Sequence, residues 1–365
     1  MQRRRDVLRQ LATGAAVAVA GGRRSAGAEP GGSTGAAGPD RIRIGQIGVG
    51  HAHASKLAVW RQSPDYEVVG IAEPDPALRA RAGSQPAFQG LPWMTQEELL
   101  GQPGLRAVLV ETEVRRSLDA AEACVAAGMH VHIDKPAGTS LVQLRRVLDV
   151  AAEKRLLVQM GYMYRYNPGI VLLRRIVAEG WLGEIFEAHA AMSKAMPPPS
   201  RRELAAYPGG TLFEFGGYLI DMIYKILGPA ERVVGFTQHA AAADDGLADN
   251  GLAVLAYPRA LATIRSSGVE VQGERRRHVV VCGTEGTCQV QPLDNPGVTL
   301  TLARPRGDHP AGTHEIPLPR YVRHVDDAAD MARVIRGEKP TDFPYEHDFA
   351  VHRALFEACG LPLDT

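Results

Sequence analysis

The chain has 365 residues, of which 45% are hydrophobic and 22% charged, and a globular chain of this length predicts two domains rather than one. Its 41 lysines and arginines balance its 41 aspartates and glutamates. Because no long basic block follows residue 24, we expect no nucleic-acid partner.

The N-terminal 28 residues predict a twin-arginine signal peptide. Arg4 and Arg5 precede a spacer and two apolar residues, a weakly apolar stretch covers residues 11–20, and small residues occupy positions 26–28. We expect cleavage after Ala28 and export to the periplasm or another extracytoplasmic space. The apolar stretch is too short to span a bilayer, so we expect no stable membrane insertion after cleavage. The alternative is a disordered basic tail on a cytoplasmic protein.

Residues 29–40 are rich in glycine, proline and alanine, and we interpret them as a linker. From residue 41 to residue 160, short apolar strands alternate with segments of helical spacing, which predicts a parallel sheet covered on both faces. The expected strands cover residues 42–47, 67–72, 107–110, 130–133 and 156–161, and the expected helices cover residues 117–127 and 141–153.

The second half, residues 161–365, has a different pattern, in which strand-like segments follow one another directly. They cover residues 185–192, 232–238, 252–257, 260–267, 278–282, 286–291 and 298–303. Several are spaced as hairpin partners, which predicts an α+β domain with an open, mainly antiparallel sheet. The chain is therefore expected to be an α/β protein with a Rossmann domain followed by this second domain.

The four cysteines, Cys124, Cys282, Cys288 and Cys359, have neither the spacing of a disulfide framework nor that of a metal site. Cys282 and Cys288 flank a predicted hairpin turn. A disulfide between them is an alternative to the interpretation we favour, which is buried free thiols.

A glycine turn joins the first predicted strand to a helix. Gly48 permits a tight turn, Gly50 lets the backbone approach a pyrophosphate, and the helix N-terminus supplies free N–H groups for the phosphates. His53 stands where the third glycine of the fingerprint would be. We assign Gly48, Gly50, His51 and His53 to cofactor binding.

Glu73 ends the second predicted strand, about 20 residues beyond the glycines, where an acidic side chain binds the hydroxyls of the adenosine ribose. A carboxylate at this position repels a 2′-phosphate, so we expect NAD rather than NADP. Arg79 and Arg81 follow and weaken that preference. The simpler interpretation of Glu73 alone is a solvated strand end.

Two pairs of histidines, His51 with His53 and His130 with His132, have the spacing of possible metal ligands. No carboxylate or cysteine at a recognised spacing completes either set. We therefore expect no metal.

The ordered motifs resemble the Gfo/Idh/MocA oxidoreductases, the group that contains glucose-fructose oxidoreductase and inositol dehydrogenase. The resemblance covers the chain from about residue 41 to its end. It depends on the glycine turn, Glu73-Pro74-Asp75, Asp134-Lys135-Pro136, Arg165-Tyr166-Asn167-Pro168 and the block from Gly209-Gly210 through Glu214 and Tyr218 to Asp221.

The resemblance implies that Lys135 lies beside the nicotinamide and the substrate. It places Glu214 and Tyr218 at the positions of an aspartate and histidine that form the acid/base pair in many relatives, on one helical face. We expect Lys135 to lower the pKa of Tyr218, so that Lys135 and Tyr218 handle the substrate proton while Glu214 orients one of them. A buried, packed tyrosine is the alternative for Tyr218.

Arg165 and Asn167 follow the strand that leaves the first domain, and we assign them to substrate or hinge contacts; Asp221 is expected to support its helix. The predicted function is that of an NAD(P)-dependent oxidoreductase acting on a CH–OH group of a sugar, polyol or related carbohydrate. The alternatives are an NAD-dependent glycosidase that oxidises its sugar transiently, and a binding protein without turnover. The resemblance also implies a homo-oligomer formed through the second sheet.

Overall fold

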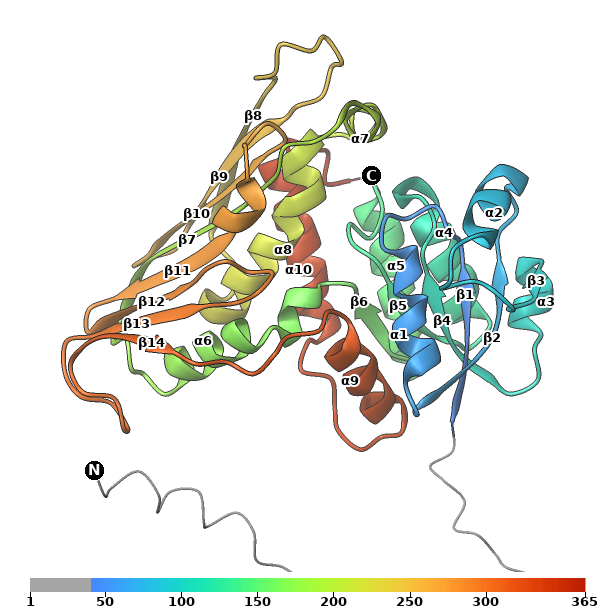
Figure 1. Ribbon diagram of the computed structural model, residues 1–365, viewed down its shortest axis with the longest axis horizontal. Helices are drawn as coiled ribbons and strands as arrows, with labels where there is room; N and C mark the ends of the chain where they lie inside the picture. Colours follow the sequence, from blue (N-terminus) through green and yellow to red (C-terminus); the bar gives the residue numbers. More distant parts are fainter. Residues whose placement is uncertain (1–40, 365) are drawn as a thin grey trace, which may run out of the picture. The chain divides into compact units, whose positions relative to one another are not determined.

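Two sheets organise the computed structural model, which describes residues 41–364 (Figure 1). The predicted signal peptide and linker lie outside the described residues. None of the helices between residues 41 and 364 is long and apolar enough to cross a membrane.

The first sheet is parallel throughout, with the order β3-β2-β1-β4-β5-β6. Its strands are β1 (Ile42–Ile47), β2 (Tyr66–Ala72), β3 (Trp93–Met94), β4 (Leu105–Val110), β5 (His130–Ile133) and β6 (Val158–Met160). The chain runs outward from β1 to β3 and then returns to place β4 on the other side of β1. The carboxyl ends of β1 and β4 therefore border the crevice in which doubly wound sheets bind their ligands.

Helices cover both faces of this sheet, as predicted. They are η1 (Ala54–Lys56), α1 (Leu57–Gln62), α2 (Pro76–Gly83), α3 (Gln96–Leu100), α4 (Val114–Ala126) and α5 (Leu141–Glu153). Successive residues of β4 point to opposite faces: Val108 packs into the core under α4 and α5, whereas Leu109 packs into the core under α1. This double burial explains why residues 107–110 of β4 are all apolar instead of alternating with polar residues.

The second sheet has the order β14-β13-β12-β11-β7-β10-β9-β8 within the described part of the chain. Its pairs are antiparallel except for β7 with β10. The strands are β7 (Ile185–Ser193), β8 (Arg232–Gln238), β9 (Asn250–Ala256), β10 (Leu261–Ser267), β11 (His278–Gly283), β12 (Gly286–Val290), β13 (Val298–Leu302) and β14 (Gly312–Ile316). The predicted mainly antiparallel sheet is confirmed.

Helices cover one face of the second sheet and leave the other open (Figure 1). The helical elements of this half are η2 (Met163–Tyr166), α6 (Pro168–Ala178), α7 (Pro198–Leu204), α8 (Gly210–Leu227), η3 (Gly273–Arg276), α9 (Val325–Ile335) and α10 (Tyr345–Ala358). Of these, α8 and α10 pack together against the inner face, whereas α9 packs against α1 of the first half. Tyr66 in β2 donates a hydrogen bond to the carbonyl of Ala328 in α9, 2.7 Å away.

The cysteines are free thiols. In the β11–β12 hairpin Cys282 lies opposite Thr287, and Cys288 lies opposite Val281. The disulfide considered as an alternative is therefore wrong, because adjacent pairs in a hairpin point to opposite faces of the sheet.

Candidate functional site

The glycine turn closely approaches the neighbouring loop. Gly48 has a φ of +89°, and a Cβ on it would lie 2.5 Å from the backbone nitrogen of Thr112, just beyond β4. At Gly50 a Cβ would lie 3.1 Å from Cγ of Glu113. Position 48 requires both a left-handed backbone and the absence of a side chain, and only glycine has both. The two glycines thus let the turn pass directly against the loop after β4, at the strand ends where a phosphate group would approach.

Glu73 is tied to this turn. It ends β2 with only 4% of its surface exposed, and its Oε2 accepts a hydrogen bond from the backbone N–H of Val49 at 2.9 Å. Its Oε1 accepts one from the N–H of Asp75, also at 2.9 Å. The carboxylate therefore joins the turns after β1 and β2, and it has lone pairs left for a further donor.

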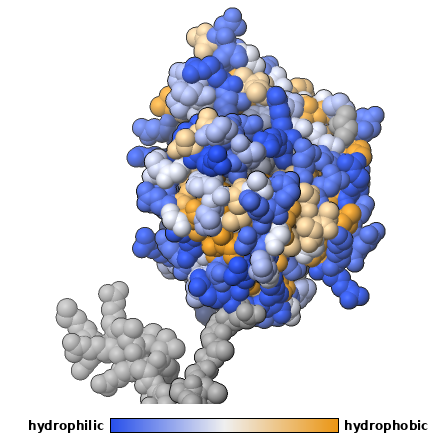
Figure 2. Space-filling model, turned by 90° about the vertical axis from the view of Figure 1, so that its right-hand side faces the viewer, coloured by the Kyte–Doolittle hydropathy of each residue, from blue (hydrophilic) through white to orange (hydrophobic). Residues whose placement is uncertain are grey.

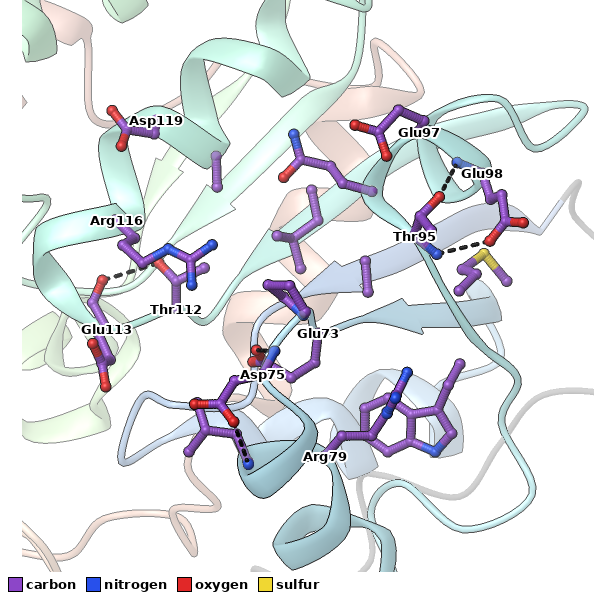
Figure 3. A pocket seen from close by; sticks show the side chains of 18 residues that line it. Glu73, Asp75, Arg79, Thr95, Glu97, Glu98, Thr112, Glu113, Arg116 and Asp119 are labelled. Carbon is purple, nitrogen blue, oxygen red and sulfur yellow. Dashed lines mark hydrogen bonds between the residues drawn. The ribbon is translucent and has the colours of Figure 1, made fainter.

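A cavity of about 680 Å³ lies beyond the ends of these strands, and Glu73 is in its wall (Figure 3). Its volume is in the range of cofactor pockets. The wall carries both signs of charge, because Arg79 and Arg116 face it together with Glu97 and Asp119. The turn, the cavity and the strand-end carboxylate fit a dinucleotide, and the mixed charge leaves the choice between NAD and NADP open.

The surface on this side of the molecule is mainly hydrophilic. Figure 2 shows the face that lies on the right-hand side of Figure 1, where α2 and α3 are drawn. Hydrophobic residues gather in a patch near the middle of that face.

The structure brings Lys135, Glu214 and Tyr218 together from the two halves of the chain. Lys135 follows β5 and is 2% exposed; its Nζ donates a hydrogen bond to Oε1 of Glu214 on α8, 2.6 Å away. The carboxylate of Glu214 is partly open to solvent, and the ammonium lies over the ring of Tyr218, 5.2 Å from its centroid. The proximity implied by the resemblance is thus present.

The expectation that Lys135 lowers the pKa of Tyr218 is wrong. The Tyr218 hydroxyl is buried and has no hydrogen-bond partner among the described residues. The rings of Tyr162 and Tyr164 pack against Tyr218 edge to face. Burial raises the pKa of Tyr218 well above its ordinary value, and the negative charge of Asp134 adds to that effect. Lys135 pairs with Glu214 instead of the hydroxyl.

Arg165 and Asn167 lie away from this group, and their polar atoms are engaged elsewhere. Nη2 of Arg165 donates to Oδ1 of Asp221 at 2.6 Å and also bonds Asp348, inside the core. Oδ1 of Asn167 accepts from the N–H groups of Gly169 and Ile170 and caps α6. The structure therefore gives both residues supporting contacts and does not place them at the candidate site. Asp221 supports α8 through its bonds to Arg165, as expected.

A buried ion cluster that the sequence analysis missed lies beneath the glycine turn. Nζ of Lys56 is 2.5 Å from Oδ2 of Asp134, 2.7 Å from Oε1 of Glu111 and 2.8 Å from Nε2 of His132. Glu111 directly follows β4 and Asp134 directly follows β5. An acidic residue at the end of two neighbouring predicted parallel strands was the available signal, because those ends meet at one edge.

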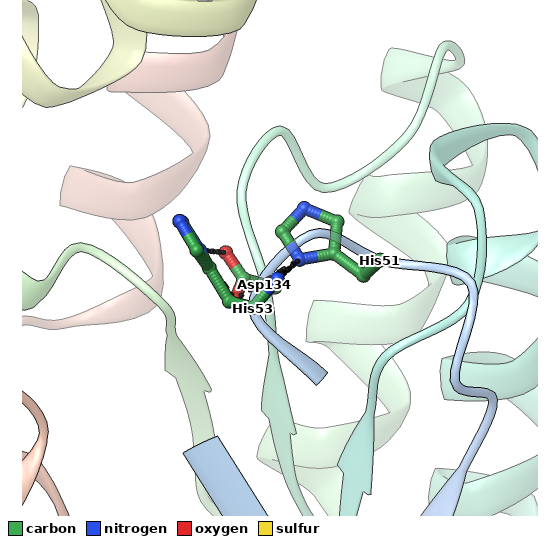
Figure 4. Close-up of side chains that lie close together, drawn as sticks. All are labelled: His51, His53 and Asp134. Atoms are coloured by element: carbon green, nitrogen blue, oxygen red, sulfur yellow. Dashed lines mark hydrogen bonds and ion pairs between the residues drawn. The ribbon is translucent and has the colours of Figure 1, made fainter. Parts of the chain in front are cut away.

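His51 and His53 border the same cluster (Figure 4). Nδ1 of His51 is 3.4 Å from Oδ2 of Asp134 and 3.5 Å from Oε2 of Glu111, and Nδ1 of His53 is 3.1 Å from Oδ2 of Asp134. The atoms are close enough to share a cation, but the ammonium of Lys56 already contacts this oxygen of Asp134. The absence of a metal stays a prediction.

His130 and His132 have different surroundings. Nδ1 of His130 accepts the N–H of Leu157 at 2.8 Å, and His132 lies between Gln159 and Lys56. Burial lowers the pKa of each to about 4, so both rings are neutral at pH 7. They act as packed, hydrogen-bonded residues of β5.

A second, smaller cavity of about 100 Å³ joins the two halves. From the first half it is lined by Gly50, His51 and Glu113, and from the second by Lys194 and Glu214. It therefore connects the glycine turn with the carboxylate that holds Lys135. This position is the candidate place for a small substrate.

The fold and the turn define an oxidoreductase of the dinucleotide-binding Rossmann class, and comparison with known families agrees. The model of the oxidoreductase family with an NAD-binding Rossmann fold matches residues 42–162, and the model of the GFO/IDH/MocA C-terminal domain matches residues 170–289. The chain belongs to the Gfo/Idh/MocA oxidoreductase family, as the motifs predicted.

Similar proteins include dehydrogenases of diols and of inositol. The chain is 26% identical to the human trans-1,2-dihydrobenzene-1,2-diol dehydrogenase over 80% of its own length and 85% of that protein. It is 29% identical to inositol 2-dehydrogenase 1 of Saccharopolyspora erythraea, over 72% of this chain and 77% of that protein. GenD2 from gentamicin A biosynthesis, solved with NAD, has a similar fold, with a TM-score of 0.72, 21% identity and coverage of 87% of this chain and 93% of GenD2.

Proposed function

We propose that this protein is an NAD-dependent dehydrogenase that transfers a hydride between its cofactor and a carbinol or carbonyl carbon of a sugar, polyol or related diol. The observation that carries the proposal is the pairing of Lys135 with Glu214 at 2.6 Å, at the ends of the parallel strands and beside a cavity shared by both halves. The diol and inositol dehydrogenases among its relatives support the substrate class.

The chain supplies position and charge for this chemistry. When bound, the nicotinamide accepts or donates the hydride. The Lys135 ammonium, aimed by Glu214, orients a substrate hydroxyl and stabilises negative charge that develops on its oxygen. The small cavity is lined by Glu214, the partner of this ammonium, and by Lys194, and both offer polar contacts to a hydroxylated molecule.

NAD is the proposed cofactor, because the carboxylate of Glu73 lies at the end of β2 in the wall of the larger cavity. A carboxylate there favours ribose hydroxyls over a 2′-phosphate. Arg79 and Arg116 in the same wall oppose this preference. The NAD complex of GenD2 supports the proposal.

Export by the twin-arginine route is also proposed, on the strength of the two arginines, the apolar stretch and the small residues in the first 28 positions. This route carries folded proteins, so the cofactor would be loaded before export. A homo-oligomer is proposed as well, with the open face of the second sheet as its interface.

The test of the enzymatic proposal is turnover with NAD⁺ on a panel of polyols and cyclic diols that includes myo-inositol, followed as NADH absorbance. We expect Lys135→Met to bind NAD⁺ as the wild type does and to lose roughly 100-fold or more in kcat/KM. Lys154→Met is the matched control, because its ammonium binds only carbonyls at the end of α4.

Two results would contradict the dehydrogenase. Cleavage of an aryl glycoside with no net change in NADH would indicate the NAD-dependent glycosidase. Tight binding of NAD(H) without exchange of a labelled hydride to any member of the panel would indicate a binding protein.

A further inference from the structure

We propose that His51 is the acid/base residue of this site: its Nε2 exchanges the proton of the substrate hydroxyl, while Glu111 and Asp134 hold the imidazole through Nδ1. This inference rests on the proposed dehydrogenase function and names the residue that moves the proton.

The position of His51 suits this role. It follows Gly50 in the glycine turn, and it lines the small cavity together with Glu214. Its Nδ1 faces the carboxylates of Asp134 and Glu111 at 3.4 and 3.5 Å. Figure 4 shows the other ring nitrogen turned away from Asp134, and Nε2 makes no hydrogen bond to any residue in the described part of the chain.

The paired carboxylates select the useful form of the ring. With a proton on Nδ1, beside the charges of Asp134 and Glu111, the lone pair of Nε2 is available to accept the substrate proton. The backbone N–H of His53 also points at Nδ1, from 3.2 Å, and favours the other tautomer. Asp134 and Glu111 lie at ion-pair distances of 3.4 and 3.5 Å from Nδ1 and favour a proton on it through their two negative charges, which outweigh one amide dipole.

The buried cluster has an excess negative charge, which stabilises an imidazolium on His51. Lys56 supplies one positive charge against the two negative charges of Glu111 and Asp134, which leaves an excess negative charge. Burial lowers the pKa of His51, but Asp134 and Glu111 raise it by more, so that it lies above its ordinary value. The titratable and charged groups around His51 come from both halves. On its own half they are His53, Lys56, Glu111, Glu113, Asp134 and Lys135, and across the cavity they are Lys194, Glu203, Tyr207 and Glu214.

Tyr218 lacks the same access. Its hydroxyl is buried without a partner among residues 41–364, and its side chain is absent from the lining of the small cavity. Its raised pKa keeps the hydroxyl protonated at neutral pH, so it cannot accept the proton of a substrate hydroxyl. In this chain His51, in the glycine turn, therefore takes the acid/base role that a histidine on the helix has in many relatives.

In the direction of alcohol oxidation, two bonds of the substrate break. The C–H bond breaks with its electron pair, which leaves as hydride to the nicotinamide. The O–H bond breaks, its proton goes to Nε2 of His51, and the C=O double bond forms. The positive charge lost from the nicotinamide ring reappears on the imidazolium, so the net charge of the site is unchanged.

This conservation of charge gives a test that needs no substrate. NAD⁺ brings a positive charge to the cluster and NADH does not, so NAD⁺ binding should displace the proton from His51. Calorimetry at pH 7 in phosphate and in Tris measures the protons released on binding each cofactor. We expect wild type to release more protons with NAD⁺ than with NADH, and His51→Asn to lose that difference.

The matched variants are His314→Asn, which changes a histidine of β14 in the second sheet near the carbonyl of Pro310, and Tyr218→Phe; both should keep the difference. Nitrogen NMR of the wild type, with the His51 signals assigned by their loss in His51→Asn, gives the tautomer and pKa directly even if the variant is unstable. We expect the Nδ1–H tautomer in the neutral ring and a pKa that falls when NAD⁺ binds.

With an active polyol, His51→Asn should lower kcat/KM by roughly 100-fold or more and flatten its pH profile, whereas Tyr218→Phe should stay within about threefold of wild type. The inference is overturned if His51→Asn binds both cofactors and keeps the proton difference, or if Tyr218→Phe shows the large loss. A stoichiometric metal ion whose removal abolishes activity would overturn it too, in favour of a metal held by the histidines. Failure of the wild type to bind either cofactor would instead remove the proposed function itself.

Discussion

Single residues at the strand ends carry most of the charge that defines this site. Lys56, Glu111 and Asp134 are buried together, and a buried charge without a partner destabilises a fold by several kcal/mol. The geometry of Lys135 depends on this group, because Oδ1 of Asp134 accepts the backbone N–H of Lys135 at 2.7 Å. The cluster thereby fixes the start of the segment that places the Lys135 ammonium.

Gly48 offers a test of the glycine turn at this scale. Gly48→Ala adds a Cβ that would lie 2.5 Å from the Thr112 nitrogen, on a backbone with φ of +89°. We expect it to destabilise the protein by more than the roughly 1–2 kcal/mol of left-handed strain alone, and to weaken NAD⁺ binding. Urea denaturation and calorimetric titration measure the two effects.

Gly90→Ala is the control for Gly48→Ala. Gly90 also has a positive φ, +75°, but a Cβ there meets nothing within 4 Å. It should show the strain cost alone and bind NAD⁺ normally. Equal losses in the two variants would contradict the close approach at Gly48.

At the scale of elements, the strands with apolar runs were predictable, including the three-residue β6, whereas two others were not. The strand expected at residues 67–72 is β2, Tyr66–Ala72, and the strand expected at residues 232–238 is β8. Strands β3 and β14 were missed, because β3 has only two residues and β14 has a single strongly apolar residue, Ile316. Helix α3 was also missed, although Thr95 and Glu98 form a capping box that the sequence displays.

The residues of the site that belong to the family motifs were predictable from the sequence, and the others were not. The resemblance placed Lys135 and Glu214 correctly beside each other. The surroundings of Tyr218 were not predictable, because they depend on Tyr162 and Tyr164 from another segment. The same limit applies to Lys56, whose partners lie at the ends of β4 and β5. The acidic strand ends gave a signal for Glu111 and Asp134, but no pattern around Lys56 indicates that its ammonium joins them.

Helix α9 contains a buried acid that links stability to pH. Burial raises the pKa of Asp327 to about 7 from an ordinary value of 3.8. The folded protein therefore binds a proton there more tightly than the unfolded chain does, so Asp327 lowers stability as pH rises between these values. We expect Asp327→Asn to remove a slope of up to about 1.4 kcal/mol per pH unit in that window.

The measurement is urea denaturation of wild type and Asp327→Asn from pH 4 to pH 8, with the difference between them plotted against pH. Asp326→Asn is the control, because Asp326 is exposed in the same turn of α9. A constant difference across the range would show that Asp327 has an ordinary pKa.

At the scale of the molecule, the C-terminal helices join the two halves. Although α9 follows the second sheet in sequence, its Ala328 and Met331 belong to the core under α1 of the first half. The core under α4 and α5 continues into the residues of α8 and α10. The small cavity that holds His51 and Glu214 therefore lies between halves that are packed together, which favours a site of fixed geometry.

The open face of the second sheet is the remaining large feature. Phe236 on β8 and Leu261 on β10 are 59% and 57% exposed, and Phe236 pairs across the sheet with Leu252, another exposed residue. If this face is the interface of the proposed homo-oligomer, burying these side chains would stabilise it at about 25 cal/mol per Å² of apolar surface. A charge placed there would have to be desolvated in the assembly and would weaken it.

We therefore expect Phe236→Asp to shift the protein to a smaller species in analytical ultracentrifugation while its melting temperature at low concentration and its NAD⁺ affinity stay close to those of wild type. Val322→Asp is the control, because Val322 is 48% exposed but lies outside the sheet. An unchanged sedimentation coefficient for Phe236→Asp would exclude this face as the interface. A wild type that sediments as a monomer at every concentration would exclude the oligomer itself, and the exposed apolar residues of β8 to β10 would then need another partner.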